Sequence, residues 1–111
     1  MNLAPGTALE RYVITSTVGQ GGFGITYLAE HSKLKTLVVI KEFFPNQLVY
    51  RADDGVRVEP NPDYEDEAGH FLESFEKEAQ LLATFAHNNI VQVTDVFEAN
   101  DTAYIVMPYE R

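Results

Sequence analysis

Short apolar runs alternate with polar turns along most of the chain, and one stretch with a helical period interrupts them. Five runs are rich in β-branched and aromatic residues and predict strands: Tyr12–Val18, Ile25–Glu30, Leu37–Phe43, Ile90–Phe97 and Ala103–Tyr109. Between the third and fourth runs, the segments LVYR and VRVE flank an aspartate-glycine turn at Asp54 and Gly55, which predicts an additional hairpin. The first part of the chain therefore has the pattern of a sheet.

The period changes to that of a helix from Phe71 onward. One stripe of a 3.6-residue repeat carries four apolar residues: Phe71, Phe75, Leu82 and Phe85. Glu78 occupies the remaining place on that stripe, where a carboxylate is costly unless it is paired. Lys41, the one cation in the third strand, is the natural partner. Periodicity alone also allows Glu78 to lie at the edge of the stripe while Lys41 reaches solvent.

The order of elements is three strands, a helix and two strands, which predicts an α+β fold. We expect a five-stranded antiparallel sheet with one long helix on one face and an extra hairpin between the third strand and the helix. A length of 111 residues, 45% of them hydrophobic, agrees with one globular domain.

Charge and composition exclude several partners. The formal net charge of -9 argues against a general nucleic-acid surface or an anionic-membrane surface, because both need a basic face. The chain has no cysteine and only three scattered histidines, so we expect no metal site. It also has neither a signal pattern nor an apolar run long enough to cross a bilayer, so we expect a cytoplasmic location.

A glycine cluster joins the first two predicted strands, with the spacing Gly19-x-Gly21-x-x-Gly24. This spacing occurs in dinucleotide-binding folds, in nucleotide-binding hairpins and in plain turns. A dinucleotide fold needs a helix after the third glycine, whereas a strand follows here, and the absence of a Gly-Lys-Ser/Thr sequence excludes a Walker loop. A glycine hairpin followed by a strand with one lysine instead resembles the phosphate-binding arrangement of protein kinases.

From about Tyr12 to its end, the chain resembles the N-terminal lobe of a bacterial eukaryotic-like (Hanks-type) Ser/Thr protein kinase. The stretches GQGGFGIT and VVIK resemble the family's G-x-G-x-x-G-x-V and V-A-I-K motifs. The stretch EAQLLATFAHNNIV resembles the helix motif E-x-x-x-L-x-x-L-x-H-P-N-I-V, with Glu78 at the ion-pair position. Residues that depart from these patterns include Thr26, Val39 and Asn88.

The resemblance implies that ATP binds under the glycine-rich turn. The residues it assigns to nucleotide binding are Val18, Gly19, Gln20, Gly21, Gly22, Phe23, Gly24, Thr26, Val39, Lys41, Val91, Met107, Pro108 and Glu110. The backbone amides from Gln20 to Gly24 would cover the phosphates, with Phe23 at the tip excluding water. Lys41, aligned by an ion pair with Glu78, would hold the α- and β-phosphates as the catalytic pair.

The same resemblance assigns the other nucleotide contacts. Four residues would wall the adenine: Val18, Thr26, Val39 and Val91. Met107 would lie at the back of the pocket. The carbonyl of Pro108 and the amide of Glu110 would bind the edge of the adenine, and proline keeps the carbonyl that is needed.

The resemblance also implies that the lobe is incomplete as a kinase. We expect residues 1–11 to be an N-terminal extension and residues 12–111 to be the lobe, with an insert at about 42–69 and the C-terminal lobe absent. The sequence contains no HRD or DFG motif, so the isolated lobe should be inactive, and Mg²⁺ and the protein substrate should bind the missing lobe. The alternative is a non-catalytic pseudokinase or interaction module that retained the fold.

Two further expectations concern surfaces. Apolar positions near Leu82, Val93 and Met107 would face the other lobe, and in its absence they could drive self-association. The insert is either a plain surface hairpin or a regulatory element that biases the position of the helix and the Lys41–Glu78 pair.

Overall fold

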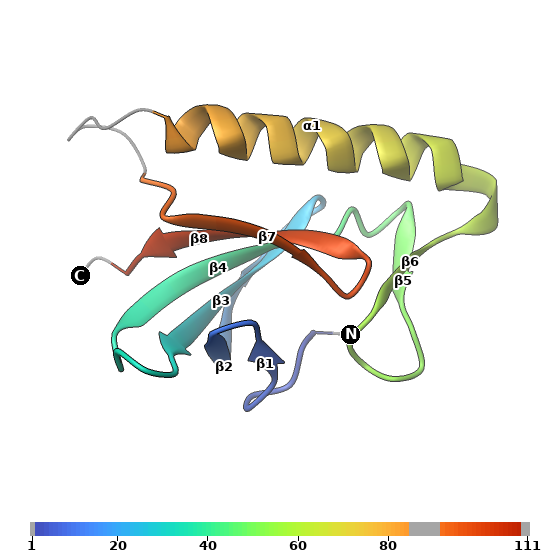
Figure 1. Cartoon of the computed structure of the whole chain (residues 1–111). Coiled ribbons are helices and arrows are strands. Elements are labelled where there is room, and N and C mark those ends of the chain that lie inside the picture. Colours follow the sequence, from blue (N-terminus) through green and yellow to red (C-terminus); the bar gives the residue numbers. More distant parts are fainter. Residues whose placement is uncertain (1, 85–91, 110–111) are drawn as a thin grey trace.

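The computed structural model describes residues 2–84 and 92–109. The chain folds into an antiparallel sheet with a long helix across it (Figure 1). The elements are β1 (Ala8–Leu9), β2 (Tyr12–Gln20), β3 (Gly24–His31), β4 (Leu37–Phe43), β5 (Val49–Arg51), β6 (Val58–Pro60), the 3₁₀ turn Pro62–Tyr64, α1 (Glu65–Ala83), β7 (Asp95–Ala99) and β8 (Thr102–Pro108). The main sheet has the order β1-β2-β3-β4-β8-β7 with antiparallel neighbours, and β5 pairs with β6. The α+β fold class is confirmed.

The sheet has six strands rather than the predicted five. The additional strand, β1, comes from the segment that the sequence predicts to be an extension. Leu3 and Leu9 of this segment are each 1% exposed, and the backbone N–H of Leu3 donates to the Tyr27 hydroxyl over 3.1 Å. The first residues therefore belong to the core of the lobe. At the other end of the sheet, β7 begins at Asp95, later than the predicted Ile90.

The two faces of the sheet have different partners because side chains alternate along a strand. One face, which we call the core face, carries fully buried residues: Ile25, Tyr27, Ile40, Tyr104 and Val106. The other face carries Thr26, Val39, Lys41 and Met107, which are half-buried or exposed. The helix lies along this second side of the molecule, and Phe75 of α1 contacts Phe43 of β4 with ring centroids 5.1 Å apart (Figure 1).

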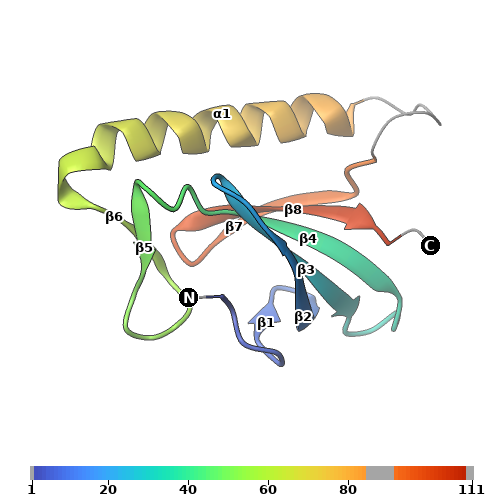
Figure 2. The same cartoon turned by 180° about the vertical axis from the view of Figure 1, so that it is seen from behind.

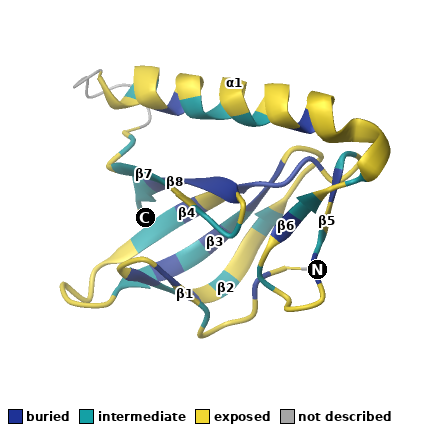
Figure 3. Cartoon of the chain, turned by 45° about the vertical axis from the view of Figure 1, so that its right-hand side comes forward, coloured by how far each residue is buried: buried dark blue, intermediate teal, exposed yellow. Residues whose placement is uncertain are grey.

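The stripe that the helix presents to the sheet overlaps the predicted one only in part: Phe75 and Leu82 are half-buried, whereas Phe71 and Glu78 are exposed. The helix begins at Glu65 rather than near Phe71, and its buried residues are Ala68 and Ala79. Phe71 is 44% exposed. Small side chains at the two buried positions let the helix approach the sheet without a clash. The helix is consequently buried along a narrow line and exposed over most of its surface (Figure 3), and the predicted Phe85 lies outside the described residues.

The predicted hairpin within the insert is confirmed as β5 and β6. At its turn, one carboxylate oxygen of Asp54 accepts the backbone N–H groups of Val56 and Arg57, each over 2.9 Å, and Gly55 has a φ of +75° that suits glycine. These backbone bonds, assisted by the Arg57 guanidinium, lower the pKa of Asp54 to about 2. Val49 and Val58 are buried, so the hairpin is part of the core rather than a surface addition.

In the described part of the chain, no helix combines the length and the apolar character needed to span a membrane.

Candidate functional site

The glycine-rich turn connects β2 and β3 at residues 21–23, and its last glycine is required by a close backbone approach. A Cβ atom at Gly24 would lie 2.9 Å from the carbonyl oxygen of Glu42 and 3.3 Å from Cε of Lys41. Any other residue would clash with the backbone of β4. Gly24 therefore lets β3 lie tightly against β4 and brings the turn directly over the Lys41 side chain.

Gly21 and Gly22 have no such requirement within the protein. A Cβ atom at either position would meet nothing within 4 Å, and neither residue has a left-handed φ. In the described part of the chain, the backbone N–H groups of Gly22 and Phe23 donate to no protein acceptor, whereas Gly21 donates to the Gly24 carbonyl over 2.9 Å. Two amide donors and open space thus lie together at the tip of the turn.

Strand register brings the predicted site residues together on one face. Lys41 lies opposite Thr26 on one side and Ile105 on the other, and Val39 lies opposite Met107. Residues that pair directly across strands point to the same face of a sheet. Thr26, Val39 and Met107 therefore form a half-buried floor beside Lys41.

The other predicted site residues lie around this floor. Val18 is 57% exposed near the end of β2, and Gly19 and Gln20 follow it into the turn. Pro108 ends β8 opposite Val38. Val91 and Glu110 lie outside the described residues.

Comparison with known proteins agrees with this arrangement. The family model of the protein kinase domain matches residues 12–111. The chain belongs to the protein kinase family. The kinase lobe is 34% identical over 99 residues to the serine/threonine-protein kinase PrkC of Bacillus subtilis. This match covers 89% of this chain and 12% of that protein. It is 26% identical over 111 residues to the serine/threonine-protein kinase atg1 of Schizosaccharomyces pombe, covering 98% of this chain and 11% of that protein.

Solved structures give the same assignment. The structure titled PpkA-294 apo form superposes with a TM-score of 0.92 at 33% identity, over 97% of this chain and 38% of that chain. A mutant PknI kinase domain of Mycobacterium tuberculosis superposes with a TM-score of 0.66 at 25% identity, over 98% of this chain and 37% of that chain. The chain is a kinase N-terminal lobe of the bacterial Hanks type, and it spans an eighth or less of the curated relatives it matches and well under half of the solved kinase domains.

The predicted ion pair between Lys41 and Glu78 is absent from this structure of the kinase lobe. Among the described residues, no ion pair joins the two side chains, and both are exposed. Glu78 is one residue, and so about 100° around the helix, from the buried Ala79. It therefore lies on the flank of α1, as in the alternative interpretation of the stripe.

The three apolar residues that the sequence predicts to face the other lobe are partly exposed in this structure, and self-association through them stays a prediction. Leu82, Val93 and Met107 are half-buried. Larger exposed fractions occur at other apolar side chains, among them Val18, Phe23, Phe71 and Leu81.

A buried charged cluster directly beside Lys41 was missed by the sequence analysis. Glu42 is 0% exposed, and its carboxylate accepts hydrogen bonds from the hydroxyls of Tyr27 (2.9 Å) and Tyr104 (2.7 Å). The guanidinium of Arg51 in β5 donates to both oxygens of the same carboxylate, over 2.7 and 2.9 Å. We call these four residues the Glu42 cluster.

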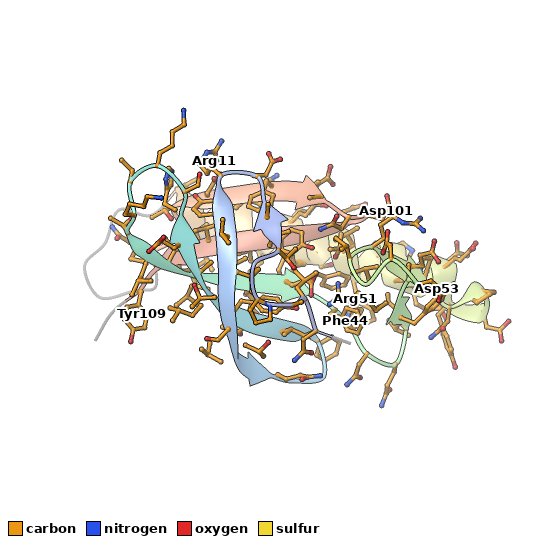
Figure 4. The ribbon with its side chains drawn as sticks, turned by 90° about the horizontal axis from the view of Figure 1, so that it is seen from below. Arg11, Phe44, Arg51, Asp53, Asp101 and Tyr109 are labelled. Carbon is orange, nitrogen blue, oxygen red and sulfur yellow. The ribbon has the colours of Figure 1, made fainter. Side chains whose placement is uncertain are left out.

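The Glu42 cluster fastens the hairpin of the insert to the main sheet. Arg51 also lies over the Phe44 ring, 4.7 Å from its centroid (Figure 4). Burial lowers the pKa of Arg51, but the hydrogen bonds and charge of Glu42 outweigh it, so the pKa is raised. Burial, and then the charge of Glu42, raise the pKa of Tyr27 and of Tyr104, so both phenols stay protonated as donors.

One signal in the sequence pointed to this cluster. Glu42 follows Val38 and Ile40 at alternate positions of the third strand, which assigns it to the core face. The identity of its partners could not be read from this pattern, because Arg51 reaches it only through the path of the insert.

Proposed function

We propose that this lobe binds ATP between the glycine-rich turn and the face of β4 that carries Lys41, as the nucleotide-binding part of a Ser/Thr protein kinase. The observation that supports the proposal most directly is the tip of the turn. Gly21 and Gly22 leave space that nothing in the described chain occupies, and the amides of Gly22 and Phe23 have no protein acceptor. Amide donors of a turn are suited to phosphate oxygens.

Each residue has a role in this proposal that follows from its place in the sheet. Lys41 lies under Gly24, where its ammonium group would neutralise the α- and β-phosphates. Val18, Thr26, Val39 and Val91 would cover the faces of the adenine ring, and Met107 would close the back of the pocket. The Pro108 carbonyl and the Glu110 amide would bind the edge of the adenine.

ATP supplies the γ-phosphoryl group that is transferred to a Ser or Thr hydroxyl. The lobe contributes positioning and charge neutralisation, which account for most of the protein's part in phosphoryl transfer. Its 111 residues contain neither an HRD nor a DFG motif. We therefore propose that proton abstraction, Mg²⁺ binding and substrate binding need residues beyond this lobe, and that the lobe by itself transfers no phosphate.

An alternative function is a non-catalytic module that kept the kinase fold. The separation of Lys41 and Glu78 favours it, because an active kinase needs this pair in place. The reading frame of the gene discriminates the two, since HRD and DFG motifs downstream of the lobe would support catalysis.

The test of nucleotide binding is an ATP titration of the isotope-labelled 111-residue chain, with and without Mg²⁺, followed by amide chemical shifts. We expect saturable shifts in Gly19–Gly24 and near Lys41. Replacement Lys41→Met should weaken binding about tenfold or more, because a charged hydrogen bond to a phosphate contributes about 1.5–3 kcal/mol.

The matched control is Lys33→Met, which removes an exposed lysine from the β3–β4 turn and should leave the affinity unchanged. Shifts that stay flat at millimolar ATP, or an equal loss of affinity in both variants, would contradict the proposed site.

A further inference from the structure

An aromatic contact joins the glycine-rich turn to the helix. The ring of Phe23, at the tip of the turn, lies 5.7 Å from the ring of Phe71 in α1, with a tilt of 51° between the ring planes. Figure 2 shows the β2–β3 turn rising toward α1. Phe23 is 61% exposed and Phe71 is 44% exposed, so the contact is made at the surface rather than within the core.

Backbone hydrogen bonds hold the turn from its other side. The Phe44 N–H donates to the Phe23 carbonyl over 3.0 Å, and the Asn46 N–H donates to the Gly22 carbonyl over 3.1 Å. These bonds continue the β3–β4 pairing past the end of both strands. They use the carbonyl groups of the turn and leave the amides of Gly22 and Phe23 available.

One side of α1 faces both the glycine-rich turn and the part of β4 next to Lys41. Phe71 and Glu78 are seven residues apart, which places them two turns apart and within about 20° around the helix. The ring contact of Phe75 with Phe43 joins α1 to β4 two residues after Lys41. A rotation or shift of α1 therefore moves Phe71 and Glu78 together.

We propose that Phe71 is a positioning residue for the glycine-rich turn. Its ring packs against Phe23 and restricts the position of the turn, and this contact couples the turn to the position of α1 and Glu78. The proposal rests on the proposed function, because the coupling matters for the lobe's nucleotide. While the two rings are in contact, the turn holds its two available amides in a defined place, so less conformational freedom is lost when phosphate oxygens bind.

Coupling between two sites is reciprocal. If the ring contact joins the turn to α1, then nucleotide bound at the turn changes the environment of Glu78, and a change at Phe71 changes the nucleotide affinity. A plain packing role for Phe71 predicts a change in stability with no effect on either quantity.

The experiment compares two replacements at Phe71 with the original residue. Phe71→Leu keeps an apolar side chain and good helix propensity but removes the ring, whereas Phe71→Tyr keeps the ring and places its hydroxyl at the exposed surface. Leu81→Ala is the control, because Leu81 is 59% exposed on the same helix and follows Phe71 by ten residues, about 15 Å along the helix axis.

Three quantities are measured on the labelled chain: the ¹⁵N heteronuclear NOE of Gly21–Gly24 without nucleotide, the affinity for ATP, and the change in the Glu78 amide shift on ATP binding. For Phe71→Leu we expect lower NOE values in the turn, about threefold to tenfold weaker ATP binding, and loss of the Glu78 shift change. Phe71→Tyr should restore all three, and Leu81→Ala should match the original chain.

Unchanged NOE values and affinity in Phe71→Leu would overturn the inference, and so would an equal change in Leu81→Ala. The amide spectrum of α1 shows for each variant that the helix is still formed. If the original chain binds no ATP, the proposed function fails. The NOE comparison then still tests whether the contact between Phe71 and Phe23 orders the turn, because it needs no nucleotide.

Discussion

At the scale of single residues, the most informative position is Glu42, next to the proposed phosphate-binding lysine. A buried carboxylate is tolerated only when donors surround it, and the Glu42 cluster supplies four hydrogen bonds from three side chains. Because Glu42 and Lys41 are consecutive in β4, the cluster fixes the strand from the core face while Lys41 projects from the other.

Replacement Glu42→Gln should destabilise the lobe by about 3 kcal/mol or more. The change keeps the shape of the side chain but removes the negative charge that the Arg51 guanidinium meets in a buried setting. The measurement is the free energy of unfolding from urea titration. The control is Glu59→Gln, which removes an accepting carboxylate from the exposed Arg57 and should cost under about 1 kcal/mol. Equal losses in the two variants would show that burial of the cluster has no special importance.

Residue types with a strict local requirement were predictable from the sequence, and those whose role depends on a neighbouring element were not. Gly24 and Lys41 follow from strand period and turn spacing, and the register places them together. The position of Glu78 depends on the rotation of α1, which Ala68 and Ala79 decide by allowing close approach. A hydrophobic stripe records where apolar residues recur but not which of them meets the sheet.

At the scale of elements, the contact between α1 and β7 brings the carboxylate of Glu76 under the influence of Glu98. Burial raises the pKa of Glu76 in α1, and the hydrogen bond and charge of Glu98 in β7 raise it further. A folded-state pKa above the unfolded value means that this contribution to stability is fully present below the unfolded pKa and is lost as the pH rises through the folded one. Helix docking should therefore be weaker at pH 7 than at pH 4 as far as this pair is concerned.

Replacement Glu76→Gln should raise the melting temperature at pH 7 by a few degrees at most, because the pair is partly solvated and contributes only a fraction of a kcal/mol. At pH 4 the gain should shrink, since Glu76 is then largely protonated in the folded chain. Circular dichroism melts at the two pH values provide the measurement. The control Glu67→Gln changes an exposed carboxylate in the first turn of α1 and should give no gain at pH 7. A gain for Glu76→Gln that is independent of pH would exclude the carboxylate pair as its cause.

At the scale of the whole molecule, the core is assembled from segments that are far apart in the sequence. The strand pattern predicted the sheet and the α+β class, but residues 1–11 carry too short an apolar pattern to predict a strand. Their place is decided by the core face of the sheet, where Leu3 and Leu9 fill space beside Tyr27. The insert is likewise held by a contact between Arg51 and Glu42 that no local pattern contains.

Replacement Leu3→Ala tests whether the first residues belong to the lobe. Leu3 is 1% exposed, so its truncation should leave a cavity and cost about 2–5 kcal/mol, which corresponds to a melting temperature lower by roughly 10 °C or more. Leu34→Ala makes the same chemical change at a side chain that is 69% exposed, and it should alter stability by under about 0.5 kcal/mol. The Leu3 backbone amide donates to Tyr27, which in turn donates to Glu42, so the loss should also shift the Glu42 amide resonance. A melting temperature for Leu3→Ala equal to that of Leu34→Ala would mean that residues 1–11 are an appendage, and that the sheet holds its phosphate-binding face without them.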